Sequence, residues 1–211
     1  MPLGAWVRGL FGPFEPQVAN AWRALFVDLD QWTSVIRNWS PAPRRILEVG
    51  CGEGYSTARL AETFPGIPID AIDIAGHIGR LYDGPPGAVT FRIAFVQEVA
   101  AERPGGYDLV VLTDVLHHVP QAERAGLLDA IHAVLAPGGV LAFKDWERAP
   151  FSPVHYLVHG ADRWLTGDRV AYLRPDEARA LVAGSFGPGA ITAETTIRPW
   201  SHNYAFRILR D

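Results

Sequence analysis

The chain has 211 residues, of which 48% are hydrophobic and 20% charged, and its formal net charge is −4. This composition predicts one globular domain, and the small negative charge without a basic stripe argues against nucleic-acid binding. The single cysteine, Cys51, excludes an intrachain disulfide framework. No apolar run approaches a membrane span, and the apolar N-terminus lacks a basic start. We therefore expect a cytoplasmic protein that is not inserted in a membrane.

The first predicted element is an amphipathic helix. Its apolar residues recur at helical spacing: Val18, Trp22, Leu25, Phe26, Leu29, Trp32, Ile36 and Trp39. The Ser-Pro-Ala-Pro segment at 40–43 ends it, because proline cannot continue a helix.

A glycine-rich turn follows this helix. An apolar strand at 45–49 enters Glu48-Val49-Gly50-Cys51-Gly52-Glu53-Gly54, and residues 56–64 read as a helix. A strand at 67–72 then ends at Asp73. A strand, a glycine turn, a helix and a later acid suggest a nucleoside cradle, in which the acid can bind a ribose diol. The third glycine comes one residue too early for the dinucleotide pattern G-x-G-x-x-G.

The remaining chain alternates strands and helices, except at residues 147–174, which are rich in aromatic, His and Arg residues. Alternation of this kind predicts a largely parallel sheet with right-handed crossovers. The predicted strands are 89–95, 107–112, 140–143, 191–197 and 204–209, and the predicted helices are 121–135 and 175–183.

Four blocks, in this order, resemble the class I S-adenosylmethionine-dependent methyltransferases: the glycine turn, Asp73, residues 107–119 (YDLVVLTDVLHHV) and residues 135–141 (LAPGGVL). The resemblance implies an α/β Rossmann-like, doubly wound, seven-stranded and mostly parallel sheet with an antiparallel C-terminal strand. It implies a single domain over 1–211. Its parts are an N-terminal helical lid (1–43), a cofactor-binding core (44–146), an acceptor-binding insertion (147–174) and a C-terminal helix with strands (175–211).

The cofactor implied by the resemblance is S-adenosyl-L-methionine. The residues carried over to it are Glu48, Gly50, Gly52, Gly54, Asp73, Ile74, Phe95, Val96, Gln97, Thr113 and His118. One position departs from the family, whose members often carry an acid after the third strand that binds the adenine amino group. Phe95 stands at or beside that place. Three readings stay open: Gln97 or a backbone carbonyl serves adenine, Phe95 stacks on the ring, or the affinity is low.

Candidate catalytic residues follow the fourth and fifth strands, whose carboxyl ends should meet at the ligand-binding edge. His117 and His118 follow the fourth strand and Asp145 the fifth. Their resemblance to some small-molecule O-methyltransferases makes His117 the general base and Asp145 the group that orients it. A purely structural or cofactor-facing role for the His-His pair is the alternative.

The neighbours of these residues are less informative. Asp114 could cap the helix that follows it, and Lys144 could pair with Asp145, meet an anionic acceptor or be solvated. Candidate acceptor contacts are Trp146, His155, His159 and Arg163, and further aromatic wall or core residues are Tyr156, Trp164 and Tyr172. No metal site is expected, because His155 and His159 have no evident third ligand.

The sequence thus predicts methyl transfer to a small-molecule acceptor at a hydroxyl oxygen by in-line displacement. We expect a bacterial enzyme of natural-product biosynthesis, monomeric or homodimeric. The alternatives are an N- or C-methyltransferase that relies on positioning, a binding module without catalysis, and an enzyme that uses the bound sulfonium for another reaction such as a cyclisation.

Overall fold

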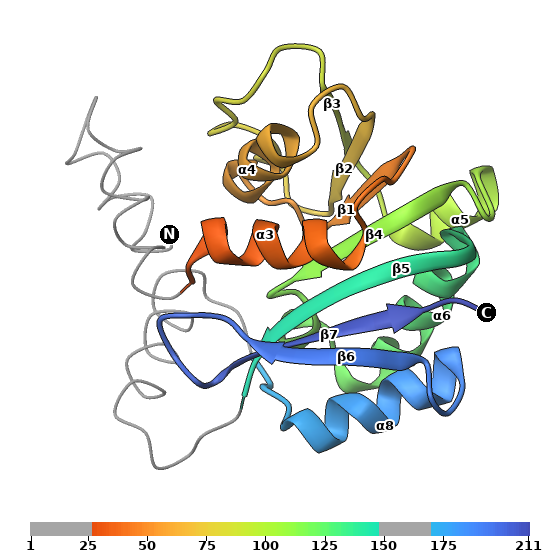
Figure 1. Ribbon diagram of the computed structural model, residues 1–211. Coiled ribbons are helices and arrows are strands. Elements are labelled where there is room, and N and C mark those ends of the chain that lie inside the picture. Colours follow the sequence, from red (N-terminus) through yellow and green to blue (C-terminus); the bar gives the residue numbers. More distant parts are fainter. Residues whose placement is uncertain (1–26, 148–169) are drawn as a thin grey trace.

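The computed structural model describes residues 27–147 and 170–211 (Figure 1). The helices are α3 (Leu29–Trp39), α4 (Tyr55–Thr63), α5 (Val96–Glu102), α6 (Arg124–Val134) and α8 (Pro175–Phe186), with short 3-10 turns η2 (Leu116–His118) and η3 (Gln121–Glu123). The strands are β1 (Ile46–Val49), β2 (Ile69–Asp73), β3 (Val89–Ile93), β4 (Tyr107–Thr113), β5 (Leu135–Trp146), β6 (Ile191–Thr196) and β7 (Asn203–Leu209).

The strands form one seven-stranded sheet in the order β3-β2-β1-β4-β5-β7-β6. Strands β1 to β5 pair in parallel, and β7 lies antiparallel between β5 and β6. The predicted fold class is therefore confirmed, including the antiparallel C-terminal strand. The strand order reverses between β1 and β4, and in such sheets ligands bind outside the carboxyl ends at that reversal.

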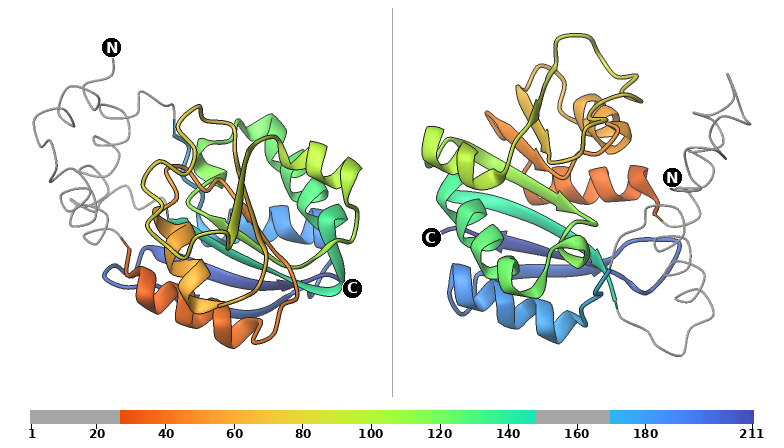
Figure 2. Two further views of the ribbon diagram at one scale, coloured as in Figure 1. Left: turned by 90° about the horizontal axis from the view of Figure 1, so that it is seen from above. Right: turned by 180° about the vertical axis from the view of Figure 1, so that it is seen from behind.

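Helices cover both faces of the sheet (Figures 1 and 2). Helices α3 and α4 pack on one face, and α5, α6 and α8 pack on the other. The central strand β4 explains why both faces need cover, since its residues alternate between the two cores. Val110 and Leu112 join one cluster, and Leu109 and Val111 join the other. A continuous apolar run is what a strand buried on both faces requires.

The predicted N-terminal helix is wrong in its extent. Helix α3 begins at Leu29, and the Asp28 side chain caps it by accepting a hydrogen bond from the Gln31 N–H at 2.9 Å. Trp32 and Ile36 are buried in the core against the sheet. The described part of the expected lid is thus a fixed layer, and residues 1–26 lie outside the described part of the chain.

Three further elements differ from the prediction. Strand β3 ends at Ile93 and Phe95 is the N-cap of α5, a short helix that the sequence pattern did not indicate. Strand β5 extends from Leu135 through the Pro-Gly-Gly segment, whereas a strand over 140–143 was expected. Pairing accounts for both ends of the extension, because Leu135 pairs with Tyr107 of β4 across a register shift and residues 144–146 pair with β7. Within the two described ranges, no helix is long and apolar enough to span a membrane.

Candidate active site

The glycine turn between β1 and α4 is shaped by a close approach of two loops. Gly50 has φ +79°, and a Cβ at this position would lie 2.2 Å from Cγ2 of Val115, in the loop after β4. Only glycine fits there, since it lacks a Cβ and tolerates positive φ. The turn is also tied to β2, because the Gly52 N–H donates to Oδ2 of Asp73 at 2.7 Å.

A cavity of about 640 Å³ lies beside this turn, at the carboxyl ends of the parallel strands. The predicted cofactor residues that line it are Gly50, Asp73, Ile74, Phe95, Val96, Gln97 and His118. Four others, Glu48, Gly52, Gly54 and Thr113, are not among its lining residues. The cavity is also lined by Asp114, Glu123 and Leu127, which sequence reasoning did not assign to the cofactor. These three residues follow β4 in the sequence, and that position is the feature from which they could have been predicted.

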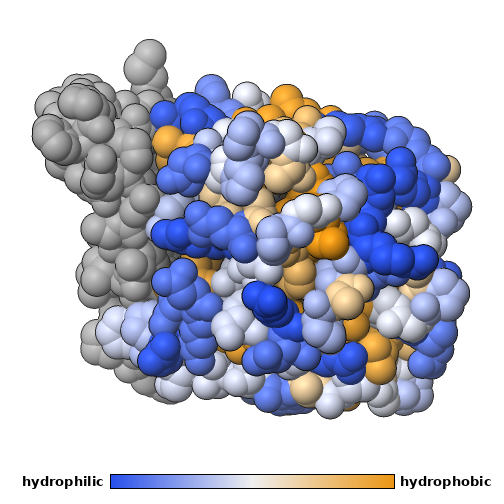
Figure 3. Space-filling view, turned by 45° about the horizontal axis from the view of Figure 1, so that its top comes forward, coloured by the Kyte–Doolittle hydropathy of each residue, from blue (hydrophilic) through white to orange (hydrophobic). Residues whose placement is uncertain are grey.

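Two exposed apolar side chains line this cavity. Hydrophobic residues form small areas between hydrophilic ones in the space-filling view (Figure 3). Among the described residues, the large exposed apolar side chains are Ile74 (67%), Ile93 (59%), Phe95 (58%) and Trp200 (37%). Ile74 and Phe95 line the cavity from the ends of β2 and β3. A flat apolar ring that packs on these two side chains displaces the water that otherwise covers them.

Glu48 and Thr113 do not line the cavity, but their hydrogen bonds connect the ends of β1 and β4 to neighbouring helices. The buried Glu48 carboxyl bonds to the Ser56 hydroxyl at 2.7 Å, at the start of α4. Burial raises the pKa of Glu48, and the hydrogen bond from the Ser56 hydroxyl opposes that rise. The Thr113 hydroxyl accepts a hydrogen bond from the Trp32 indole N–H at 2.9 Å, which ties α3 to the end of β4. Their assignment to the cofactor stays a prediction.

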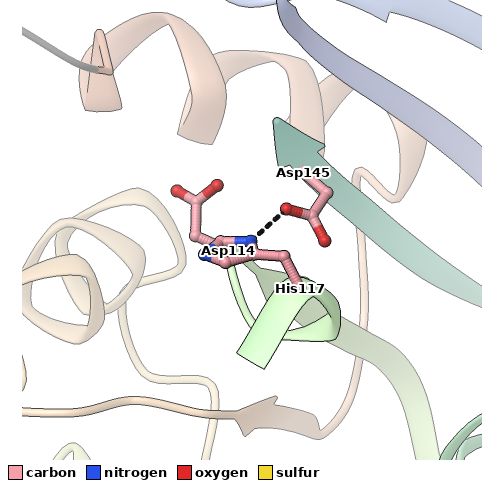
Figure 4. A group of neighbouring side chains, drawn as sticks. All are labelled: Asp114, His117 and Asp145. Atoms are coloured by element: carbon pink, nitrogen blue, oxygen red, sulfur yellow. Dashed lines mark hydrogen bonds and ion pairs between the residues drawn. The ribbon is translucent and has the colours of Figure 1, made fainter. Parts of the chain in front are cut away.

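The structure brings His117 and Asp145 together (Figure 4). His117 lies on the η2 turn after β4, and Asp145 lies near the end of β5. Nδ1 of His117 hydrogen-bonds to Oδ1 of Asp145, and both side chains are buried. Burial alone disfavours the charged carboxylate, but the pairing with His117 and the Trp146 N–H lowers the pKa of Asp145. The Asp145 carboxylate therefore holds the His117 imidazole in one orientation.

Asp114 and Lys144 form a second charged pair beside the first. Asp114 has φ +57°, a strained region for a residue with a side chain. Its carboxylate accepts two hydrogen bonds from Nζ of Lys144, at 2.7 and 2.8 Å. The suggested capping role of Asp114 is wrong, because Val115 is the N-cap of η2. A solvated Lys144 is also wrong, since the side chain is fully buried.

A metal ion is one further possibility for these side chains. Asp114, His117 and Asp145 each offer a ligand atom within 4.8 Å of the others. However, the Lys144 ammonium already neutralises both oxygens of Asp114, and Asp145 already bonds to the imidazole. The arrangement therefore suits charge and proton handling better than a divalent cation.

One aromatic residue of the predicted acceptor region, Tyr172, lies against the pair, and a second, Trp146, packs with Tyr172. Trp146 and Tyr172 are buried and pack together with Val170. The Tyr172 ring lies against His117, with ring centroids 4.8 Å apart and an interplanar angle of 32°. The predicted acceptor residues His155, His159 and Arg163 lie outside the described residues, as do Tyr156 and Trp164, and their roles stay predictions.

The fold and site define the class of protein. A doubly wound α/β sheet carries a glycine turn and an acid beside a cavity at its strand reversal, as a nucleoside cofactor requires. The chain belongs to a family of methyltransferase domains, whose sequence profile matches residues 21–182. The family predicted from the four sequence blocks is thereby confirmed.

Similar proteins carry related names. The ubiquinone biosynthesis O-methyltransferase of Azotobacter vinelandii is 32% identical over 154 residues, which are 68% of this chain and 64% of that protein. Its counterpart in Bordetella pertussis is 36% identical over 144 residues, covering 64% of this chain and 58% of that one. The chain thus spans about half to two thirds of the length of the curated relatives it matches.

Solved structures show the same fold at low identity. An O-methyltransferase family protein from Burkholderia thailandensis has a TM-score of 0.70 at 14% identity, covering 97% of this chain and 59% of that one. The 1,6-didemethyltoxoflavin-N1-methyltransferase of the same organism, crystallised with S-adenosylhomocysteine, has a TM-score of 0.66 at 18% identity, covering 99% and 88%. These similarities establish the fold alone.

The close approach at Gly50 can be tested with a matched glycine. Gly66 has φ +78°, almost the value of Gly50, but a Cβ there meets nothing within 4 Å. Gly66→Ala should cost about 1–2 kcal/mol of backbone strain. Gly50→Ala should cost about 1–3 kcal/mol more, because Val115 must move. Urea unfolding measures both, and equal losses would contradict the packing argument.

Burial of Glu48 predicts a pH-dependent stability. Because its folded pKa is raised, the protonated carboxyl contributes stability that is complete below the unfolded value of about 4.3 and is lost as pH rises through the folded value. Relative to Glu48→Gln, the wild-type free energy of unfolding should fall as the pH rises above the unfolded value of about 4.3. Exposed Glu62→Gln is the control. If the difference in free energy of unfolding between the wild type and Glu48→Gln stays constant with pH, the raised pKa of Glu48 is refuted.

Proposed function

We propose that this protein transfers a methyl group from S-adenosyl-L-methionine to a hydroxyl oxygen of a small-molecule acceptor. The observation that carries the proposal is the buried His117–Asp145 pair at the ends of β4 and β5, next to the cavity lined by Gly50 and Asp73. A hydroxyl acceptor must lose a proton as its oxygen attacks, so a positioned base contributes to the rate.

The cavity suits the adenosine part of this cofactor. Asp73 stands at the carboxyl end of β2, where its carboxylate can accept hydrogen bonds from a ribose diol. Ile74 and Phe95 supply apolar surfaces for the adenine ring, and aromatic stacking replaces part of what an acid would contribute. When bound, the cofactor supplies a methyl group on a positively charged sulfonium.

The base is organised by its neighbours. The hydrogen bond from Nδ1 to Asp145 directs Nε2 of His117 as the atom that takes the acceptor's proton. The Asp145 carboxylate then stabilises the imidazolium, as in other base–orienter pairs. Tyr172, stacked on the ring, limits its rotation.

The acceptor class follows from the relatives and the site together. The relatives that match at 32% and 36% identity are named O-methyltransferases, which supports oxygen over nitrogen as the methylated atom. The Tyr172 ring against His117, with Val170 and Trp146 packed on it, favours an acceptor with an apolar or aromatic body and a hydroxyl group.

Cofactor binding can be tested at two exposed apolar residues of similar exposure. Phe95 lines the cavity and Ile93 does not, although both are more than half exposed. Phe95→Ala should weaken S-adenosylhomocysteine about three- to tenfold, from lost ring contact, whereas Ile93→Ala should not change it. Isothermal calorimetry measures both. No binding by the wild type would refute the proposed function, and equal effects would refute only the stacking role.

The proposed His117–Asp145 base and its orienting group can be tested separately from cofactor binding. His117→Ala and Asp145→Asn should each lower kcat about 10²- to 10⁴-fold while S-adenosylhomocysteine affinity stays near wild type. His77→Ala, at an exposed histidine outside the cavity, is the control. Mass spectrometry should find one added methyl group on oxygen. Unchanged turnover in both variants would overturn the base assignment, and an N-methylated product would overturn the acceptor class.

A further inference from the structure

A buried arginine that the proposed chemistry does not use lies next to the base. Arg124 is the first residue of α6 and is 5% exposed. Its Nε donates to the Val119 carbonyl at 2.9 Å, and its Nη2 donates to the Ala171 carbonyl at 2.7 Å. Within residues 27–147 and 170–211, no carboxylate forms an ion pair with it.

The two carbonyls belong to segments that meet at His117. Val119 directly follows the η2 turn that carries His117. Ala171 lies 52 residues further along the chain, and its N–H donates to the His117 carbonyl at 2.8 Å. Tyr172, the next residue, packs its ring on the His117 ring. One guanidinium therefore joins both pieces of backbone that surround the imidazole.

The charge of Arg124 is costly without a role. Burial lowers the pKa of its guanidinium, and the negative charge of Asp145 is the first influence that opposes this. A buried cation that meets only neutral carbonyls gives up hydration without a full ion pair in return. Two carbonyls accepting from two edges of one planar fork are also a geometry that lysine cannot reproduce.

We propose that Arg124 is a positioning residue for the His117–Asp145 pair. Its guanidinium fixes the spacing between Val119 and Ala171, and this spacing holds the His117 ring between Asp145 and Tyr172. The inference rests on the proposed function for its meaning, since His117 is the base there. Its geometry can be tested without any turnover.

The test compares Arg124→Met and Arg124→Lys with Arg179→Met, a control arginine that pairs with Glu194 on the surface. Two signals are followed by NMR in the full-length protein: hydrogen exchange of the Ala171 amide, and the downfield proton of His117 Nδ1–H, assigned by its loss in His117→Ala. Arg124→Met should speed Ala171 exchange about tenfold, the effect of one hydrogen bond to a charged group, and should broaden the His117 signal. Arg124→Lys should speed exchange less.

The outcomes separate the proposals. Unchanged exchange and an unchanged His117 signal in both Arg124 variants would overturn the positioning role. Equal acceleration at core amides such as Val110 would also overturn it, because that pattern indicates a general loss of stability. If Arg124→Met does not fold, Arg124→Lys decides by the same two signals. Failure of the proposed function is seen elsewhere, as absent S-adenosylhomocysteine binding by the wild type.

Discussion

The contact between Gly50 and Val115 is the constraint on which the site depends. It brings the glycine turn after β1 against the loop after β4, at the point where the sheet reverses its strand order. The turn and Asp73 form one wall of the cavity, and the loop continues directly into η2 and His117. The absence of a side chain at position 50 thus lets the turn approach the loop that leads to the proposed base. Any larger residue at position 50 must displace Val115, which is the N-cap of η2.

Buried charge is the second organising feature. Lys144 and Asp145 are adjacent on β5, so their side chains point to opposite faces of the sheet. Lys144 pairs with Asp114 and Asp145 pairs with His117, and at the strand ends the two pairs lie side by side. Each carboxylate therefore has its own partner, and the lysine does not compete with the imidazole for Asp145. This division leaves Asp145 available to stabilise a protonated His117.

The sequence predicted those parts of the site that local pattern and parallel topology determine. Glycine spacing indicated the turn, and the parallel sheet implied that residues after β4 and β5 meet, which is why His117 and Asp145 could be paired in advance. The positive φ of Asp114 and the burial of Lys144 belong to a contact between two strands. Neither feature appears as a periodic pattern in the sequence. Helix α5 is short, and its N-cap Phe95 falls in the segment that the sequence pattern assigns to the third strand. The predicted start of the N-terminal helix was wrong because the Asp28 side chain caps a helix that begins at Leu29, although the apolar spacing continues across residue 28.

The site divides its tasks between two halves of the sheet. Strands β1 to β3 and their loops supply the cavity with the features that suit adenosine, whereas the ends of β4 and β5 supply the proposed base. The chain between β5 and α8 begins and ends beside His117, because Glu147 bridges Leu173 and Ala171 bonds to the His117 backbone. Arg124 holds Ala171 to the η2 side, so the described start of the return to α8 is fixed against the backbone of the proposed base. A proposed base that is held by the strand ends leaves acceptor specificity to other parts of the chain, and such a division lets one fold serve many acceptors.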